Sequence, residues 1–453
     1  MNHQPAIDNK QHILIQGVTD NTLTLNIDGR IEEIRNAFAE MKGLLEKLNV
    51  QTFQSADKIY NIGQITEANF GFITGKKSFN EVLTRRIMPA IKPYSPAAHN
   101  FLDNVTAIAD WETQNRISGP AKNIITSAFV GVIGFQLRKL MAIGMEALSE
   151  TKQKNYIEHC LLTAKRSLQL LCFALLSDFW DYKTKGDYTL SEKQAKTFEG
   201  FFDGLFELDI EGYLTLLKTL IGIFKDAKLP FSLPELAALE GDLQPGSAFI
   251  VAFDRLQAIN RLLDSSQYTL VDCLEAETKL TDILEVLNFL ARYKMISIKG
   301  IAYYEAKYNP ARYLHHYSEL GSDTKIKTNA ERLNYVPHPI NTDAILLYTE
   351  DYQKSVNLFP FIIDENALAQ EIGAKICFYT SKDVDNNSLT YSIVADNSTL
   401  TIGFKNVVKL MPDINELMMD PEKRKIMKLD TVFLLFKEAR DSILAPSSTK
   451  TGM

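Results

Sequence analysis

The chain of 453 residues contains little cysteine, tryptophan, glycine or proline: four, two, 22 and 15 residues respectively. So little glycine and proline excludes a collagen-like or low-complexity chain. The cysteines never form a C-x-x-C pair, which argues against a disulfide scaffold and a zinc ribbon and predicts a reducing compartment. They lie far apart, at Cys160, Cys172, Cys273 and Cys377.

Long runs of one kind of residue are also missing. No basic arm or long block of like charge occurs, and the net charge of -7 argues against a nucleic-acid-binding surface. The first ten residues lack an apolar signal core, which predicts a cytoplasmic protein. The apolar stretch Ile124–Ala147 is interrupted at Gln136, and Leu168–Leu176 is shorter than the roughly 20 residues of a membrane span. Both stretches predict core helices, with a membrane-acting helical region as the alternative.

Apolar and aromatic residues are abundant, at 45% and 10% of the chain, so a large core can be buried. We predict an α+β, multidomain protein with a predominantly helical body. The predicted units are a β-hairpin with a short coiled-coil helix (1–50), the helical body (51–245), a winged-helix-like unit (246–312) and an α+β, β-rich C-terminal domain (313–453).

The strongest periodicity lies between residues 31 and 48, where apolar residues are spaced 3-4-3-4-3. This is the a/d rhythm of a coiled coil and is narrower than the face of an ordinary globular helix. It predicts an oligomer interface on a helix that pairs with another chain, and packing within its own domain is the alternative. The predicted interface residues, here called the seam, are Ile31, Ile34, Phe38, Met41, Leu45 and Leu48.

The segments around this helix predict short strands. Residues 12–29 have the alternation of a β-hairpin, and residues 58–62 resemble a further strand. Together with the run ADKIYNIGQITEANF (residues 56–70), this region resembles N-terminal adaptor and effector-associated segments of bacterial conflict-system proteins. In that family such segments precede signalling NTPases, proteases or other effectors. The resemblance covers residues 12–70 and implies a role in assembly or coupling.

The helical body shows five segments with helical spacing. Ser191 and Gln194 form a predicted capping box, and Ser118-Gly119-Pro120 predicts a break between helices. The predicted helices are Phe101–Trp111, Asn123–Leu148, Tyr156–Trp180, Ser191–Phe206 and Ile210–Lys225.

A helix at Lys279–Lys294 followed by a strand pair turning at Lys299-Gly300 predicts the end of a winged-helix module. A DNA-reading helix would carry Arg, Lys, Asn or Gln. This one offers an acidic-to-neutral face with Asp282 and Glu285, which favours a structural or protein-binding unit over a DNA-binding one.

The final third is predicted to be β-rich and to close with a helix over Glu422–Leu444. The candidate strands are Ala344–Tyr348, Leu358–Ile363, Lys375–Tyr379, Leu389–Val394 and Leu400–Phe404.

Three motifs resemble chemical sites without completing them. The loop at 71–78 has three residues between its glycines, where a phosphate loop needs four. Asp383–Asn387 lacks the glycine and the final glutamate of a calcium loop, which favours a polar turn. Glu305 and Lys307 form only half of a metal-dependent nuclease motif. The sequence therefore assigns no catalytic, cofactor-binding or metal-binding residue, and no cofactor.

These patterns predict a non-enzymatic protein-interaction component, acting as adaptor, regulator or effector substrate in a bacterial signalling or antiviral defence assembly. Its predicted partners are proteins, with a homo-oligomer formed through the N-terminal helix; nucleic acid and membrane are not expected partners. A winged-helix DNA-binding regulator and a membrane-acting effector are the alternatives. An enzyme whose site is assembled from distant residues also remains open.

Replacing Phe38 and Leu45 together with glutamate should lower the oligomer mass while helical content stays nearly unchanged, because both substitutions place charge in the seam. Light scattering and far-ultraviolet circular dichroism measure the two quantities. An unchanged mass would contradict the coiled-coil prediction.

Overall fold

The structure is a computed structural model that describes residues 13–19, 22–27, 52–55, 58–61, 79–105, 111–185, 188–307, 309–322, 332–336, 342–350, 355–383, 385–406 and 420–446. The seam residues Ile31, Ile34, Phe38, Met41, Leu45 and Leu48 lie outside these ranges, as does the glycine-containing loop at 71–78.

Four short strands form a sheet near the N-terminus, in the order β1-β2-β3-β4. β1 (Ile13–Thr19) and β2 (Thr22–Ile27) pair antiparallel, which confirms the predicted hairpin. β4 (Lys58–Asn61) confirms the second strand signal. β3 (Thr52–Ser55) was not predicted; it runs parallel to β2 and antiparallel to β4.

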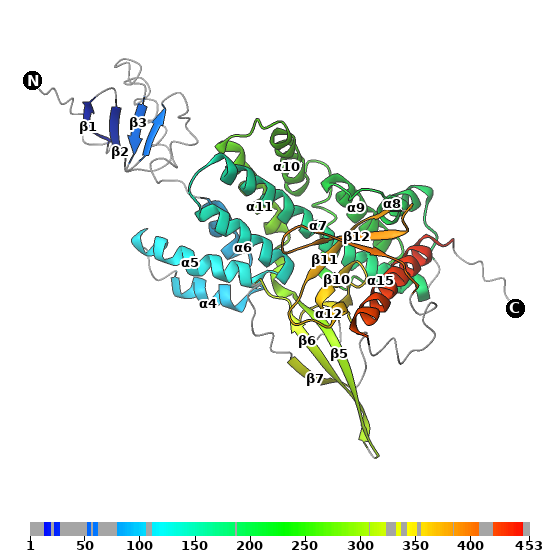
Figure 1. The fold of residues 1–453 in the computed structure, drawn as a ribbon. Coiled ribbons are helices and arrows are strands. Elements are labelled where there is room, and N and C mark those ends of the chain that lie inside the picture. The colour runs from blue at the N-terminus through cyan, green and yellow to red at the C-terminus, as the bar shows by residue number, and fades with distance from the viewer. Residues whose placement is uncertain are drawn as a thin grey trace, which may run out of the picture.

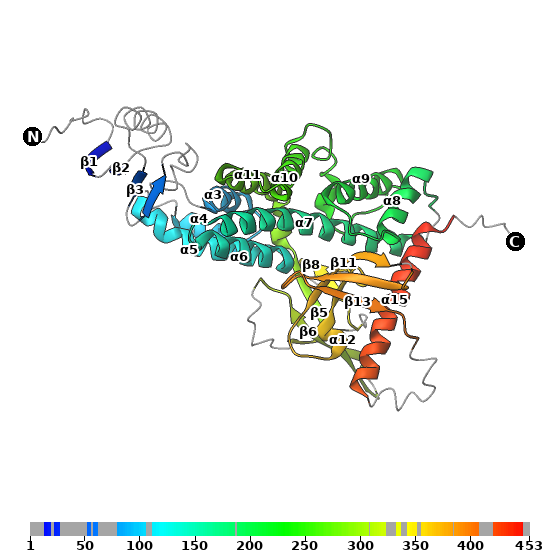
Figure 2. The same cartoon turned by 45° about the horizontal axis from the view of Figure 1, so that its top comes forward.

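A layer of helices follows and confirms the predominantly helical body (Figure 1). The 36-residue α7 runs through the middle of this layer, with α6 and α11 beside it in both views (Figure 2). The helices are α3 (Glu81–Ala90), α4 (Pro96–Val105), α5 (Trp111–Ala128), α6 (Gly131–Met145), α7 (Glu150–Lys185), α8 (Glu192–Phe202), α9 (Ile210–Asp226), α10 (Ala248–Asp264) and α11 (Leu270–Val286), with 3₁₀ turns η2 (Pro234–Ala237) and η3 (Asn288–Arg292).

Two predicted helix boundaries were wrong. α5 continues through Ser118-Gly119-Pro120, where a break was predicted. Proline costs a helix one hydrogen bond, but Ala121 and Ile125 just beyond it are buried in the core, and that burial opposes the cost. The predicted single helix Asn123–Leu148 is instead interrupted at Phe129–Val130, and α6 begins at Gly131.

A five-stranded antiparallel sheet follows the helices, in the order β7-β6-β5-β8-β9. Its strands are β5 (Lys294–Ala306), β6 (Asn309–Glu319), β7 (Arg332–Val336), β8 (Ile345–Tyr348) and β9 (Val356–Asn357).

The predicted strand turn at Lys299-Gly300 was wrong, because β5 runs straight through it and turns only after Ala306. The pairing of β5 with β6 shifts register between Ile298 and Gly300, so the glycine marks a bulge and not a turn. A winged-helix unit is therefore not confirmed.

The C-terminal part is β-rich, as predicted. β10 (Ile362–Asp364), β11 (Ile376–Asp383), β12 (Ser388–Ile393) and β13 (Thr399–Gly403) pair in sequence order as an antiparallel sheet. The short α12 (Glu365–Ala369) and the closing helix α15 (Pro421–Leu444) pack beside it.

One apolar core extends from α3 through the helical layer to the C-terminal sheet and α15. At its centre the ring of Phe173, on α7, lies 5.9 Å from that of Phe361 and 5.7 Å from that of Phe378. The buried Tyr379 hydroxyl donates to the carbonyls of Phe201 and Phe202, at 3.3 and 3.2 Å. The helical body and the C-terminal sheet therefore share their core.

Ion pairs around Asp203 reinforce the contact between the helical layer and the C-terminal sheet. Asp203, after α8, accepts hydrogen bonds from Arg440 of α15 at 2.6–2.9 Å and from Lys382 of β11 at 3.0 Å. Burial raises the pKa of Asp203, but the hydrogen bonds from Arg440 and Lys382 outweigh it and the net pKa is lowered. The ionised carboxylate is thus the form that joins the three elements.

Gly131→Ala should lower the free energy of unfolding by about 3 kcal/mol. A Cβ at this position would lie 1.7 Å from the carbonyl oxygen of Leu320, a backbone atom that can move only if the end of β6 moves. Urea unfolding measures the change. The matched control is Gly222→Ala within α9, where nothing lies within 4 Å; it should stabilise the chain by about 0.5–1 kcal/mol. Equal effects at both positions would contradict the close packing.

Candidate functional site: a groove between the helices and the five-stranded sheet

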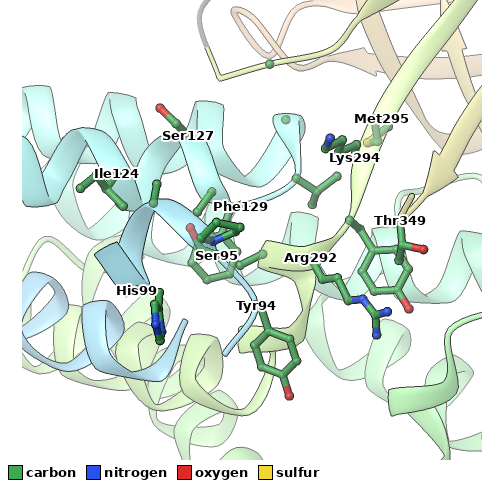
Figure 3. A pocket seen from close by; sticks show the side chains of 18 of the residues that line it. Tyr94, Ser95, His99, Ile124, Ser127, Phe129, Arg292, Lys294, Met295 and Thr349 are labelled. Atoms are coloured by element: carbon green, nitrogen blue, oxygen red, sulfur yellow. The ribbon is translucent and has the colours of Figure 1, made fainter. Parts of the chain in front are cut away.

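The described residues form an open groove of about 1420 Å³ (Figure 3). Four parts of the chain form it: the α3–α4 turn with the start of α4, the α5–α6 junction, the segment from η3 into β5, and the ends of β6 and β8. Side chains from these separate parts, among them Tyr94, Ile124 and Arg292, surround the opening in Figure 3.

The α3–α4 turn is held by local hydrogen bonds. The amides of Tyr94 and Ser95 both donate to the carbonyl of Ile91, at 3.0 and 2.9 Å. Ser95 then accepts from the amide of Ala98 at 3.3 Å, which caps the first turn of α4. Pro93 and Pro96 flank this cap and further restrict the backbone. This wall of the groove is therefore preformed.

The opposite wall depends on close backbone packing. Phe129 and Val130 are buried at the break between α5 and α6. Gly131 follows directly, and the Leu320 carbonyl packs against it. The amide of Leu320 donates to the carbonyl of Met295 at 2.9 Å, so β6 and β5 are fixed at the same place. Helix and sheet meet here without space for a side chain between them.

Charges on the rim are mixed and mostly paired. Asp103 lies 2.8 Å from Lys92 and 3.1 Å from His99, and the hydrogen bond from Lys92 lowers its pKa. On the other side Glu235 accepts from the Tyr293 hydroxyl at 2.7 Å and lies 3.8 Å from Arg292. Lys294, Glu319 and Glu350 add charges of both signs. The rim therefore has neither the strongly basic character of a nucleic-acid surface nor that of an acidic cation site.

The size and lining of the groove favour a polypeptide ligand. Pockets for small molecules typically have volumes of about 300–1000 Å³ and bury most of the ligand. This groove is larger and open, and both apolar and polar side chains line it. Such a surface fits one segment of another protein better than it fits a small metabolite.

A second cluster, Ser297, Lys299 and Asp364, carries groups found in hydrolase sites. Asp364 accepts from the Ser297 hydroxyl at 2.7 Å, from the Lys299 ammonium, and from the amide of Lys375 at 2.8 Å. Ser297 is fully buried and Asp364 is 1% exposed. Only the Lys299 side chain reaches solvent, and it is 11% exposed. The cluster joins β5 to the start of α12, so its role is structural.

The motifs weighed in the sequence have ordinary surroundings where they are described. Asp383 accepts from the Asn386 amide at 3.0 Å in the turn between β11 and β12, which confirms a polar turn. The carboxylate of Glu305 accepts from the hydroxyl of Tyr303. Outside these motifs, burial lowers the pKa of His159 on α7, whose Nδ1 lies 2.9 Å from the carbonyl of Asn155. No group of His, Cys, Asp and Glu able to hold a metal occurs within the described ranges.

Sequence reasoning missed the groove entirely. Its lining comes from segments as distant as Lys92 and Glu350, and no single motif marks it. The only local signals are the prolines around the α3–α4 turn and the glycine at the start of α6. Neither signal indicates which distant segment forms the facing wall of the groove.

The chain was compared with protein-family models, with curated proteins and with solved structures, and none of them matches it. Within the described part of the chain, α7 is the one helix long and apolar enough to cross a membrane, but 89% of its apolar window is buried inside the fold. That degree of burial is usual for the core helix of a globular protein.

Asp364→Ala should lower the free energy of unfolding by about 3–5 kcal/mol, since it leaves the Lys299 ammonium buried without its carboxylate. Thermal or urea unfolding measures the loss. Asp254→Ala, at an exposed position of α10, is the control and should change stability by less than about 0.5 kcal/mol. A loss no larger than that of the control would show that the cluster does not hold β5.

Proposed function

We propose that this chain is a protein-interaction component, an adaptor, regulator or effector substrate of a bacterial signalling or antiviral defence assembly, and that it binds a segment of its partner in the groove. The observation that carries the proposal is the groove itself: its walls are preformed, its volume exceeds that of small-molecule pockets, and its lining mixes apolar and polar groups. The defence assembly is proposed from the resemblance of residues 12–70.

The lining also indicates the chemistry of the partner. Tyr94, Ile124 and Ala128 are partly exposed in the lining and offer apolar contact to a bound segment. Arg292, Lys294 and Glu319 in the lining offer groups for both signs of charge. A helix or extended segment with an apolar stripe and flanking charges is the ligand that matches this pattern.

Assembly through the N-terminal seam belongs to the same proposal. An a/d helix of this length is marginal alone and gains stability by pairing. Pairing would bring two grooves into one particle and raise the avidity for a partner that carries two copies of the segment.

A DNA-binding role has less support. The predicted reading face of α11 carries Asp282 and Glu285, and both lie against Arg86 of α3. Arg86 donates to Glu285 at 2.9 Å through Nε. A face that is engaged with a neighbouring helix and rich in carboxylates does not suit a DNA groove.

A membrane-acting role also has less support. Ile133, Leu137 and Leu140 of α6 are completely buried. Exposing them would require separating α6 from α7 and giving up that burial.

Ser127→Arg should weaken partner binding at least about 30-fold, because a long charged side chain at this exposed position enters the groove, where a central contact is worth about 2 kcal/mol. The measurement is recovery of the partner with the tagged full-length protein expressed in its native host. A photo-crosslinking residue at Ser127 then identifies the segment that is bound.

Thr215→Arg, on an exposed position of α9 away from the groove, is the matched control and should leave recovery unchanged. Equal recovery with both variants, or crosslinks from the α9 position and none from Ser127, would show that the groove is not the binding site.

A further inference from the structure

The outer half of the β5–β6 hairpin, here called the ribbon, projects from the body of the molecule (Figure 1). β8 pairs with β5 only at Lys294–Ser297, and β7 pairs with β6 only at Tyr313–Tyr317. Within the described part of the chain, the segment Gly300–Tyr304 of β5 thus pairs with β6 on one edge and has no paired strand on the other.

The ribbon exposes large side chains on both of its faces. Tyr303 and Tyr304 are neighbours in β5 and therefore point to opposite faces, and each is 59% exposed. The ring of Tyr303 lies 5.6 Å from that of Tyr313 across the strand pair. A two-stranded ribbon with both faces in water is only marginally stable, and tyrosine is the type of residue that protein interfaces favour.

The free edge of β5 is complementary to itself. When two copies are placed antiparallel with Ala302 on the twofold axis, Tyr303 faces Ile301 of the other copy and Tyr304 faces Gly300. An aromatic residue opposite a β-branched one is a favourable cross-strand pair, and an aromatic side chain covers the gap that a glycine leaves. Ala302 faces its own copy without crowding or like charges.

The next pair in this register is also favourable, because Glu305 faces Lys299. Lys299 is already held by Asp364, so this pair adds little, but it places no like charges together. Pairing ends there, since beyond it the edge of β5 is taken: the amide of Ile298 donates to Ala344 at 2.9 Å. At the other end of the segment, the pairing of β5 with β6 shifts register between Tyr304 and Ala306.

We propose that a second copy of this chain docks on the ribbon, through antiparallel pairing of β5 with its twofold-related copy around Ala302. An exposed edge strand is a template for another strand, and a contact on a twofold axis closes as a dimer. This contact is separate from the groove and from the seam. The dimer can therefore be tested independently of the proposed function.

The test uses charge at the twofold axis. Ala302→Glu and Ala302→Lys each place two like charges opposite one another in the dimer, which should raise its dissociation constant at least about fivefold. An equimolar mixture of the two variants places opposite charges there and should restore the dimer. Sedimentation velocity gives the masses, on full-length protein that carries Phe38→Glu and Leu45→Glu so that the seam does not contribute.

Matched controls are Thr215→Glu and Thr215→Lys, which should leave the mass unchanged alone and mixed. Dimers of the parent that are weakened by each Ala302 variant and recovered on mixing support the proposal. A monomeric parent, a mass unaffected by the Ala302 variants, or a mixture that stays monomeric would each overturn it.

Discussion

The burial of α7 is the constraint on which the rest of the structure depends. All ten residues from Ser167 to Leu176 are completely buried, and eight of them are apolar. The two polar ones are Ser167 and Gln169. A helix that is apolar on all sides needs neighbours on all sides. Helices α6, α9 and α11 cover part of its surface, and the C-terminal sheet supplies Phe361 and Phe378 against Phe173. The helical layer and the C-terminal sheet therefore complete each other's core.

Polar groups inside this core occur where two elements must be aligned. Glu277 of α11 accepts from the amides of Asn80 and Leu83, at 2.9 and 3.1 Å, and so caps α3 from a distant part of the chain. Burial raises its pKa against the effect of these hydrogen bonds. Arg166 of α7 donates to Ser392 of β12 at 2.7 Å and lies over the ring of Phe378. Buried polar contacts of this kind add directional constraints to a core that is otherwise defined only by shape.

Local signals predicted local structure well. The Ser191–Gln194 capping box is present at the start of α8, and α9, β12 and α15 lie within a few residues of their predicted ranges. The predictions failed where contacts between residues distant in the sequence determine the structure. Gly300 lies at a bulge, and the Lys299 ammonium beside it donates to Asp364, 65 positions along the chain. The groove could not be predicted, because its walls meet only after the sheet has packed on α6, and neither periodicity nor a motif encodes that meeting.

The groove and the ribbon are physically linked through β5. Lys294 and Met295, at the start of this strand, line the groove, whereas Gly300–Tyr304 form the free edge of the ribbon. β5 is hydrogen-bonded to β6 along its length, and the contact of Leu320 with Gly131 fixes the base of this pair against α6. A ligand that separates the groove walls must shift the strand pair or break that contact. Because packed contacts of this kind have few alternative arrangements, occupation of the groove would be transmitted to the direction in which the ribbon projects.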